Sequence, residues 1–170
     1  METLARVIVL DAFVHVEQMN ANTQYLLDQG HRLLQIGVGL LLFASFEGFG
    51  IPYFATPAIG LAAHRLGALQ SVLLLALGLV WPRLILGVAA SRTVFWLLIY
   101  STIAILAAYL MAAFWGAGGS TLSLTAGTAR GSTVQESLIR IVAYSSAPTG
   151  IAAFGLVLFG LQIKSERKVL

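Results

Sequence analysis

The sequence has no cysteine and very few charged residues. Only 10% of its 170 residues are charged, whereas 58% are hydrophobic and the mean hydropathy is +0.88. A soluble globular domain carries about 25% charged residues, so this chain lacks the groups to cover a water-facing surface. A lipid-facing exterior removes the conflict and predicts an integral membrane protein.

The absence of cysteine excludes disulfides, thiolate metal sites, a cysteine nucleophile and covalent heme attachment through a CxxCH motif. The lysines and arginines form no cluster, so a nucleic-acid partner is not predicted. The sequence also contains no nucleophile elbow, phosphate-binding glycine loop or HExxH motif, and its histidines lack the paired spacing of a zinc site. Any chemistry must therefore come from single polar side chains in apolar helices.

Four long apolar stretches predict transmembrane helices at residues 31–50, 61–86, 93–115 and 134–163. Each reaches the ~20 residues needed to cross the hydrocarbon core. Pro52 and Pro57 predict a tight connection after the first helix, because proline cannot continue a helix. A Gly/Ser/Thr-rich loop covers residues 116–133. The sequence thus predicts an all-α, integral membrane four-helix bundle.

The ends of the chain differ from this membrane domain of residues 31–163. Residues 1–30 carry several charges and a polar stretch at 20–24, which predicts a short amphipathic helix on the membrane or on a partner subunit. A frayed tail is the alternative. Residues 164–170 form a basic tail.

Lysine and arginine placement predicts the orientation in the membrane. With four spans, one side holds both termini and the second loop, and it carries most of the positive charge: Arg6, Arg32, Arg83, Arg92, Lys164, Arg167 and Lys168. We therefore expect an inner (cytoplasmic) membrane protein with both termini in the cytoplasm.

His64 is the histidine placed in the interior of a predicted span, whereas His31 stands at the start of one and His15 precedes the spans. Small residues share its helical face or lie beside it: Gly60, Gly67, Ala68 and Ser71. A histidine beside small side chains suits a flat macrocycle, because the imidazole ligates iron and the porphyrin approaches the backbone. The alternative is helix–helix packing with a hydrogen-bonded histidine.

Other polar residues in the spans have two interpretations each. Gln70 either reaches the same cavity or forms an interhelical hydrogen bond. Tyr109 shares the depth of His64 and either donates a hydrogen bond to a substrate oxygen or belongs to the interfacial aromatic belt. Tyr100 and Ser101 lie deeper in the same helix.

Charged residues gather at the membrane side near His64. Glu136 and Arg140 are one turn apart, and Glu47 and Arg65 lie at the same end. We expect structural ion pairs among them near the interface. The alternative is that Arg65 or Arg140 holds the propionates of a bound heme.

Six motifs occur in order along the chain: GHRLLQ at 30–35, IPYFATP at 51–57, GLAAH at 60–64, LGLVWPRL at 77–84, WG at 115–116 and QESLIR at 135–140. Together they resemble the hydroxylaminobenzene mutase family and, more distantly, styrene oxide isomerase. The resemblance covers roughly residues 30–163.

This resemblance implies isomerase chemistry without net redox change, either from aryl hydroxylamine to aminophenol or from aryl epoxide to aldehyde. The epoxide branch implies heme b bound between subunits of a homotrimer, with an axial histidine that matches His64. The iron then acts as a Lewis acid on the substrate oxygen. A tyrosine of that pocket matches Tyr109. We expect Tyr109, Gln70 and Ser101 to be the catalytic residues, with Tyr109 and Gln70 orienting a small hydrophobic substrate. His64, Gly67, Ala68, Arg65 and Arg140 are the expected cofactor-binding residues.

The chain departs from the family pattern at three positions. Gln70 and Ile105 stand where both branches carry asparagine, and Ser101 stands where the epoxide branch carries an acidic residue. These changes alter how a substrate is oriented. They leave open a non-catalytic heme-binding or electron-transfer protein, and a structural protein without cofactor. A transporter is disfavoured because the helix midpoints lack ionisable residues and no internal repeat is present.

Overall fold

The computed structural model describes residues 2–122 and 131–166, and within these ranges all regular structure is helical. The elements are α1 (Glu2–Gly50), the 3-10 turn η1 (Ile51–Tyr53), α2 (Pro57–Val80), the 3-10 turn η2 (Trp81–Arg83), α3 (Val88–Trp115) and α4 (Thr133–Glu166).

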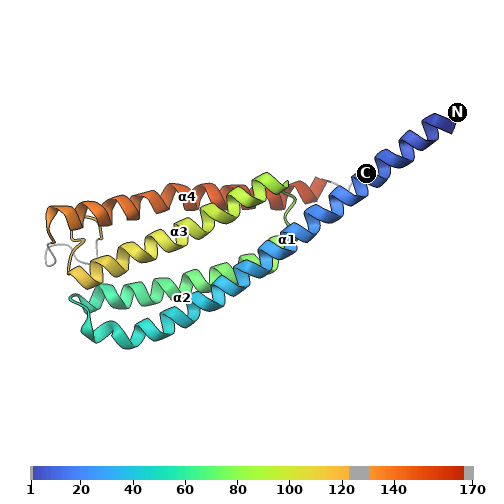
Figure 1. Ribbon diagram of the computed structural model, residues 1–170. Coiled ribbons are helices and arrows are strands. Elements are labelled where there is room, and N and C mark those ends of the chain that lie inside the picture. The colour runs from blue at the N-terminus through green and yellow to red at the C-terminus, as the bar shows by residue number, and fades with distance from the viewer. Residues whose placement is uncertain (1, 123–130, 167–170) are drawn as a thin grey trace.

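The four long helices form one bundle of two antiparallel pairs (Figure 1). α1 packs chiefly on α2 and α3 chiefly on α4, and contacts between α2 and α3 join the pairs. Each long helix contains a stretch that is long and apolar enough to cross a membrane. The prediction of an all-α bundle with four transmembrane helices is therefore confirmed.

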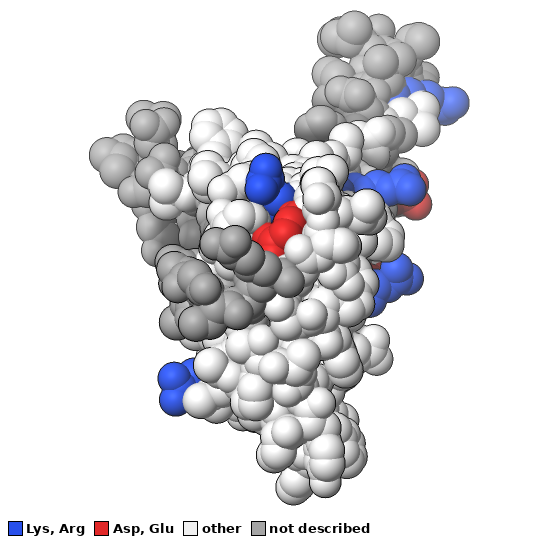
Figure 2. All heavy atoms as spheres, turned by 90° about the vertical axis from the view of Figure 1, so that its left-hand side faces the viewer, with Lys and Arg blue, Asp and Glu red and all other residues white. Residues whose placement is uncertain are grey.

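The outer surface fits burial in lipid. Large apolar side chains are exposed on every long helix, including Phe46, Leu69, Ile103 and Ile151. Figure 2, which looks onto the end that carries η1, shows a few blue and red groups on a described surface that is mostly white, that is, without charge.

α1 is longer than the sequence predicts. A transmembrane helix is expected from His31, whereas the helix runs without interruption from Glu2 and crosses the domain boundary placed after residue 30. Isolated charges do not break a helix, and no proline precedes Pro52. Part of the N-terminal half projects beyond the bundle, at the end where α4 finishes (Figure 1).

Proline ends the second helix earlier than hydropathy predicts. The apolar run continues to Leu86, but α2 stops at Val80 and Pro82 lies in η2. In η2, Trp81 is fully buried and its indole N–H donates a hydrogen bond of 3.0 Å to the Gln29 side-chain oxygen. This contact ties η2 to α1.

Small residues bring α1 and α2 into close contact. A Cβ atom added to Gly30 would lie 2.8 Å from the carbonyl oxygen of Gly78, and one added to Gly78 would lie 2.9 Å from the carbonyl oxygen of Gly30. Further along, a Cβ on Gly37 would lie 3.1 Å from the Ser71 carbonyl oxygen. Backbone atoms cannot move aside as side chains do, so these positions fix how α2 is rotated against α1.

Candidate active site

His64 lies on the face of α2 that packs against α1, about two turns after Pro57. Its Nδ1 atom is 2.9 Å from the carbonyl oxygen of Ala44. The ring lies against Gly48, where an added Cβ would be 3.1 Å from Cε1 and 3.2 Å from Nδ1. The imidazole thus occupies a space that exists because α1 has no side chain at position 48.

Two oxygen atoms determine the tautomer of His64. Besides the Ala44 carbonyl, the Glu47 carboxylate approaches Nδ1, with Oε2 at 3.4 Å. Both are acceptors, so the ring proton lies on Nδ1 and the lone pair on Nε2. No described residue forms a hydrogen bond to Nε2, and the side chain remains 33% exposed. Nε2 is therefore available to a ligand outside the described chain.

Glu47 is a buried carboxylate in an apolar helix. Its side chain is only 6% exposed, and neither of its oxygens has a hydrogen-bond partner among the described residues. The sequence suggested an ion pair with a neighbouring arginine, whereas the contact within ion-pair distance is His64.

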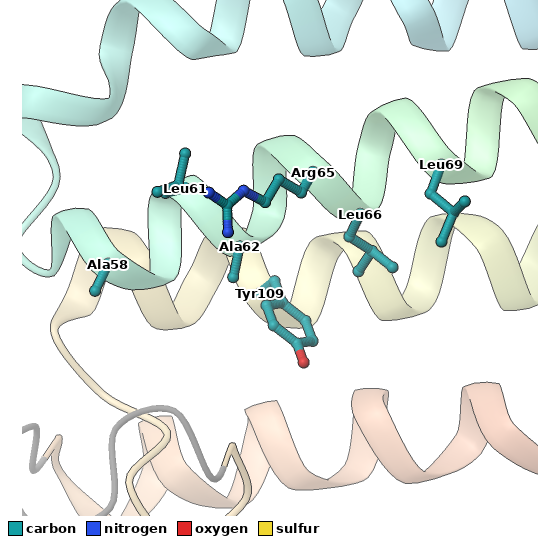
Figure 3. A pocket seen from close by; sticks show the side chains of 7 residues that line it. All are labelled: Ala58, Leu61, Ala62, Arg65, Leu66, Leu69 and Tyr109. Carbon is teal, nitrogen blue, oxygen red and sulfur yellow. The ribbon is translucent and has the colours of Figure 1, made fainter.

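A groove of about 370 Å³ lies beside this region, between α2 and α3 (Figure 3). Its wall is apolar except for the Arg65 guanidinium and the Tyr109 side chain. Arg65 lies back toward Leu61 and forms no hydrogen bond or ion pair with the described residues. The groove therefore offers a cation and a phenol in apolar surroundings.

Tyr109 lines the groove between α2 and α3, and His64 is not among the residues that line this groove. Successive residues of a helix are rotated by about 100°, so His64 faces α1 while Arg65 faces the groove on another side of α2. His64, the predicted metal ligand, thus lies on the α1 side of α2, whereas Tyr109, the predicted substrate-orienting residue, lies on the α3 side.

Two other predicted substrate residues bind neighbouring helices. Thr102 donates a hydrogen bond of 3.4 Å to the side-chain oxygen of Gln70, which is the interhelical bond considered as an alternative. The Ser101 hydroxyl donates a bond of 2.8 Å to the carbonyl oxygen of Ser146 on α4. Their roles toward a substrate stay predictions.

Of the small residues expected to make room for a macrocycle, Gly67 lies between helices and Ala68 is less enclosed. Gly67 is buried, and a Cβ added to it would be 3.3 Å from the Ala44 Cβ and 3.7 Å from a Leu106 methyl. Ala68 is half-buried, and its carbonyl oxygen accepts a hydrogen bond from Ser71.

Glu136 and Arg140 hold a loop. The Glu136 carboxylate accepts hydrogen bonds from the backbone N–H of Gly118 at 2.8 Å, the backbone N–H of Gly131 at 3.2 Å and the Ser120 hydroxyl at 2.8 Å. Arg140 donates to the Ser120 oxygen at 3.1 Å. The expected direct ion pair is thus replaced by a bridge through Ser120, which attaches the described ends of the third connection to α4.

The donor set limits which metal centres are compatible with the site. The described part of the chain has no group of three or more histidine, cysteine or acidic side chains able to hold a metal ion. Among the described residues, His64 is thus a single imidazole ligand, which is compatible with a centre whose other ligands come from outside this chain, such as a porphyrin.

A sequence model described as styrene oxide isomerase matches residues 29–162. The chain therefore belongs to this family of membrane isomerases and is an enzyme of the isomerase class.

Two curated relatives are hydroxylaminobenzene mutases of Ectopseudomonas oleovorans. HabB is 40% identical over 137 residues, which cover 81% of this chain and 84% of HabB. HabA is 34% identical over 129 residues, which cover 76% of this chain and 96% of HabA. No solved structure matches the chain. The suspected resemblance is confirmed, and the family match begins only near the end of the predicted N-terminal segment.

Proposed function

We propose that this protein is a heme-b-dependent membrane isomerase that rearranges an aryl hydroxylamine to an aminophenol. The names of both curated relatives support this substrate class. Rearrangement of an aryl epoxide to a carbonyl compound is the second candidate, favoured by the description of the matching family. Neither reaction changes the net redox state of the substrate.

The geometry of His64 carries the proposal. Its Nδ1–H is directed at the Ala44 carbonyl, which leaves the Nε2 lone pair for a metal, as in metal-bound histidines generally. The donor set fits heme, because one imidazole is sufficient when a porphyrin supplies the remaining nitrogens. When bound, the heme supplies a Lewis acid for the substrate oxygen.

The remaining groups are assigned to binding. Arg65 lies in an apolar groove and forms no ion pair with any residue that the structure describes, so a heme propionate would supply a charge partner. The Tyr109 phenol is placed to donate a hydrogen bond to a substrate oxygen. Aryl hydroxylamines and aryl epoxides are apolar and partition into lipid, so the substrate reaches the site from the bilayer. The proposed location is the cytoplasmic membrane with both termini in the cytoplasm.

We infer that the site is completed by a second copy of the chain. His64 and Tyr109 lie on different faces of one protomer, so a shared site requires that His64 of one copy faces Tyr109 of the next. A homotrimer, as the resemblance implies, satisfies this requirement with three equivalent interfaces.

The test is a product assay on protein purified in mild detergent and reconstituted with hemin. Hydroxylaminobenzene and styrene oxide are offered separately, and products are followed by chromatography. We expect aminophenol from the wild type and none from His64→Ala. Gly39→Ala serves as control, because a Cβ at Gly39 meets no atom within 4 Å. Equal rates for heme-free and heme-loaded protein would refute the proposed function.

The shared site is tested by mixing two inactive variants, His64→Ala and Tyr109→Phe, carrying different tags. In a randomly mixed ring about one quarter of the interfaces hold both unaltered residues, so we expect activity to return in mixed oligomers. No recovery in oligomers shown to carry both tags would place the site within one chain.

A further inference from the structure

We propose that Glu47 is a positioning residue that orients the His64 imidazole and increases its electron donation to a bound metal. This inference rests on the proposed function, because it concerns the same histidine. The starting observation is that Glu47 is buried without any hydrogen-bond partner among the described residues.

An unpaired buried carboxylate is costly in an apolar span. An ion pair with an arginine does not explain the burial of Glu47, because the nearby arginines are directed elsewhere. Arg65 lies in the groove on another face of α2, and Arg140 bonds to Ser120. The group that Glu47 approaches is His64, at 3.4 Å from Nδ1.

One turn of α1 forms the support for the ring. Ala44, Glu47 and Gly48 are spaced i, i+3 and i+4, so they lie on the same helical face. Ala44 supplies the carbonyl that accepts from Nδ1–H, Glu47 places a carboxyl oxygen 3.4 Å from Nδ1, and Gly48 leaves space for the ring.

The consequence for His64 follows from the chemistry of metal-bound histidines. The acceptor of the N–H on the non-coordinating nitrogen fixes the ring orientation, and a carboxylate beside that N–H adds to the orientation and raises the basicity of the coordinating nitrogen. A more electron-donating ligand stabilises ferric over ferrous iron. Glu47 would thereby keep the centre in the oxidation state that attracts an oxygen lone pair, which suits a reaction without net redox change.

The experiment compares the full-length wild type with Glu47→Gln, using hemin as the probe. The glutamine keeps the size of the side chain and removes its charge. Hemin affinity is measured from the Soret absorbance, the reduction midpoint by spectroelectrochemistry and the folded state by thermal unfolding. Glu17→Gln is the control, because it removes an exposed carboxylate from the same helix.

We expect Glu47→Gln to bind hemin roughly 10–100-fold more weakly and to show a midpoint shifted to more positive potential. Glu17→Gln should match the wild type. Glu47→Asp keeps the charge and should give a reduction midpoint between those of the wild type and Glu47→Gln. If Glu47→Gln does not fold, Glu47→Asp replaces it in the comparison.

Two failures are distinguishable. If wild type and Glu47→Gln bind hemin through His64 with the same affinity and midpoint, Glu47 is a structural residue and the inference is wrong. If the wild type binds no hemin, or binds it equally well without His64, the proposed function itself fails.

Discussion

Replacing Gly48 by alanine is expected to weaken heme binding by a predictable amount. The added Cβ would lie 3.1 Å from Cε1 and 3.2 Å from Nδ1 of His64, whereas nonbonded carbon atoms prefer about 3.5–4.0 Å. The ring must therefore move away from α1 by roughly half an ångström. Because the acceptor, the Ala44 carbonyl, is also on α1, this movement stretches the 2.9 Å hydrogen bond.

A hydrogen bond stretched beyond about 3.2 Å is substantially weakened. Its net contribution is about 0.5–1.5 kcal/mol, which corresponds to an approximately 2- to 12-fold loss of hemin affinity. Gly48→Val adds two further methyl groups against the ring and should lose more.

The assay is a hemin titration in detergent, with Gly39→Ala as the matched control. Both substitutions replace a glycine within α1, but a Cβ at Gly39 meets no atom within 4 Å. The control therefore separates the contact with His64 from the general gain of helix propensity. Gly48 does not support the His64 ring if Gly48→Ala binds hemin as tightly as the wild type, or if Gly39→Ala loses as much hemin affinity as Gly48→Ala.

Three further substitutions test the fold and the groove. Gly78→Ala should lower the free energy of unfolding by about 1–3 kcal/mol, because its Cβ would lie 2.9 Å from the Gly30 carbonyl oxygen. An unchanged unfolding temperature would mean that α1 and α2 do not need this close contact. Trp81→Phe should destabilise by about 1–3 kcal/mol, since it leaves the buried Gln29 side chain without its donor at 3.0 Å, and thermal unfolding again measures the loss. Arg65→Gln should weaken hemin binding without changing thermal stability, because Arg65 bonds to no described residue; a drop in stability with unchanged hemin affinity would contradict the propionate assignment.

Much of the fold is predictable from the sequence because its determinants are local. Continuous apolar runs define four spans. Pro52 and Pro82 follow the ends of α1 and α2, and Pro57 is the first residue of α2. The start of α1 was not predictable in the same way. Charges at residues 2–28 suggest a separate segment, yet nothing there interrupts the backbone hydrogen bonds of a helix.

The site was predicted in part. His64 follows from its position in an apolar span, but its neighbours depend on how α2 rotates about its own axis. That rotation is fixed by glycine contacts such as Gly30 with Gly78, which hydropathy does not reveal. The sequence does indicate that Glu47 can lie near His64. Glu47 is one turn from the end of α1 and His64 is about two turns from the start of α2, so both lie at the same end of the bundle. The sequence instead suggested an arginine as its partner.

The central claim is that His64 binds heme iron in this isomerase, and the visible absorption spectrum tests it most directly. The wild type and His64→Ala are purified from the same membranes and compared before and after addition of hemin. If His64 binds the iron, the wild type shows a Soret band that is lost or shifted in His64→Ala. A wild-type spectrum that stays flat after hemin is added, or a Soret band identical in both proteins, would contradict this claim.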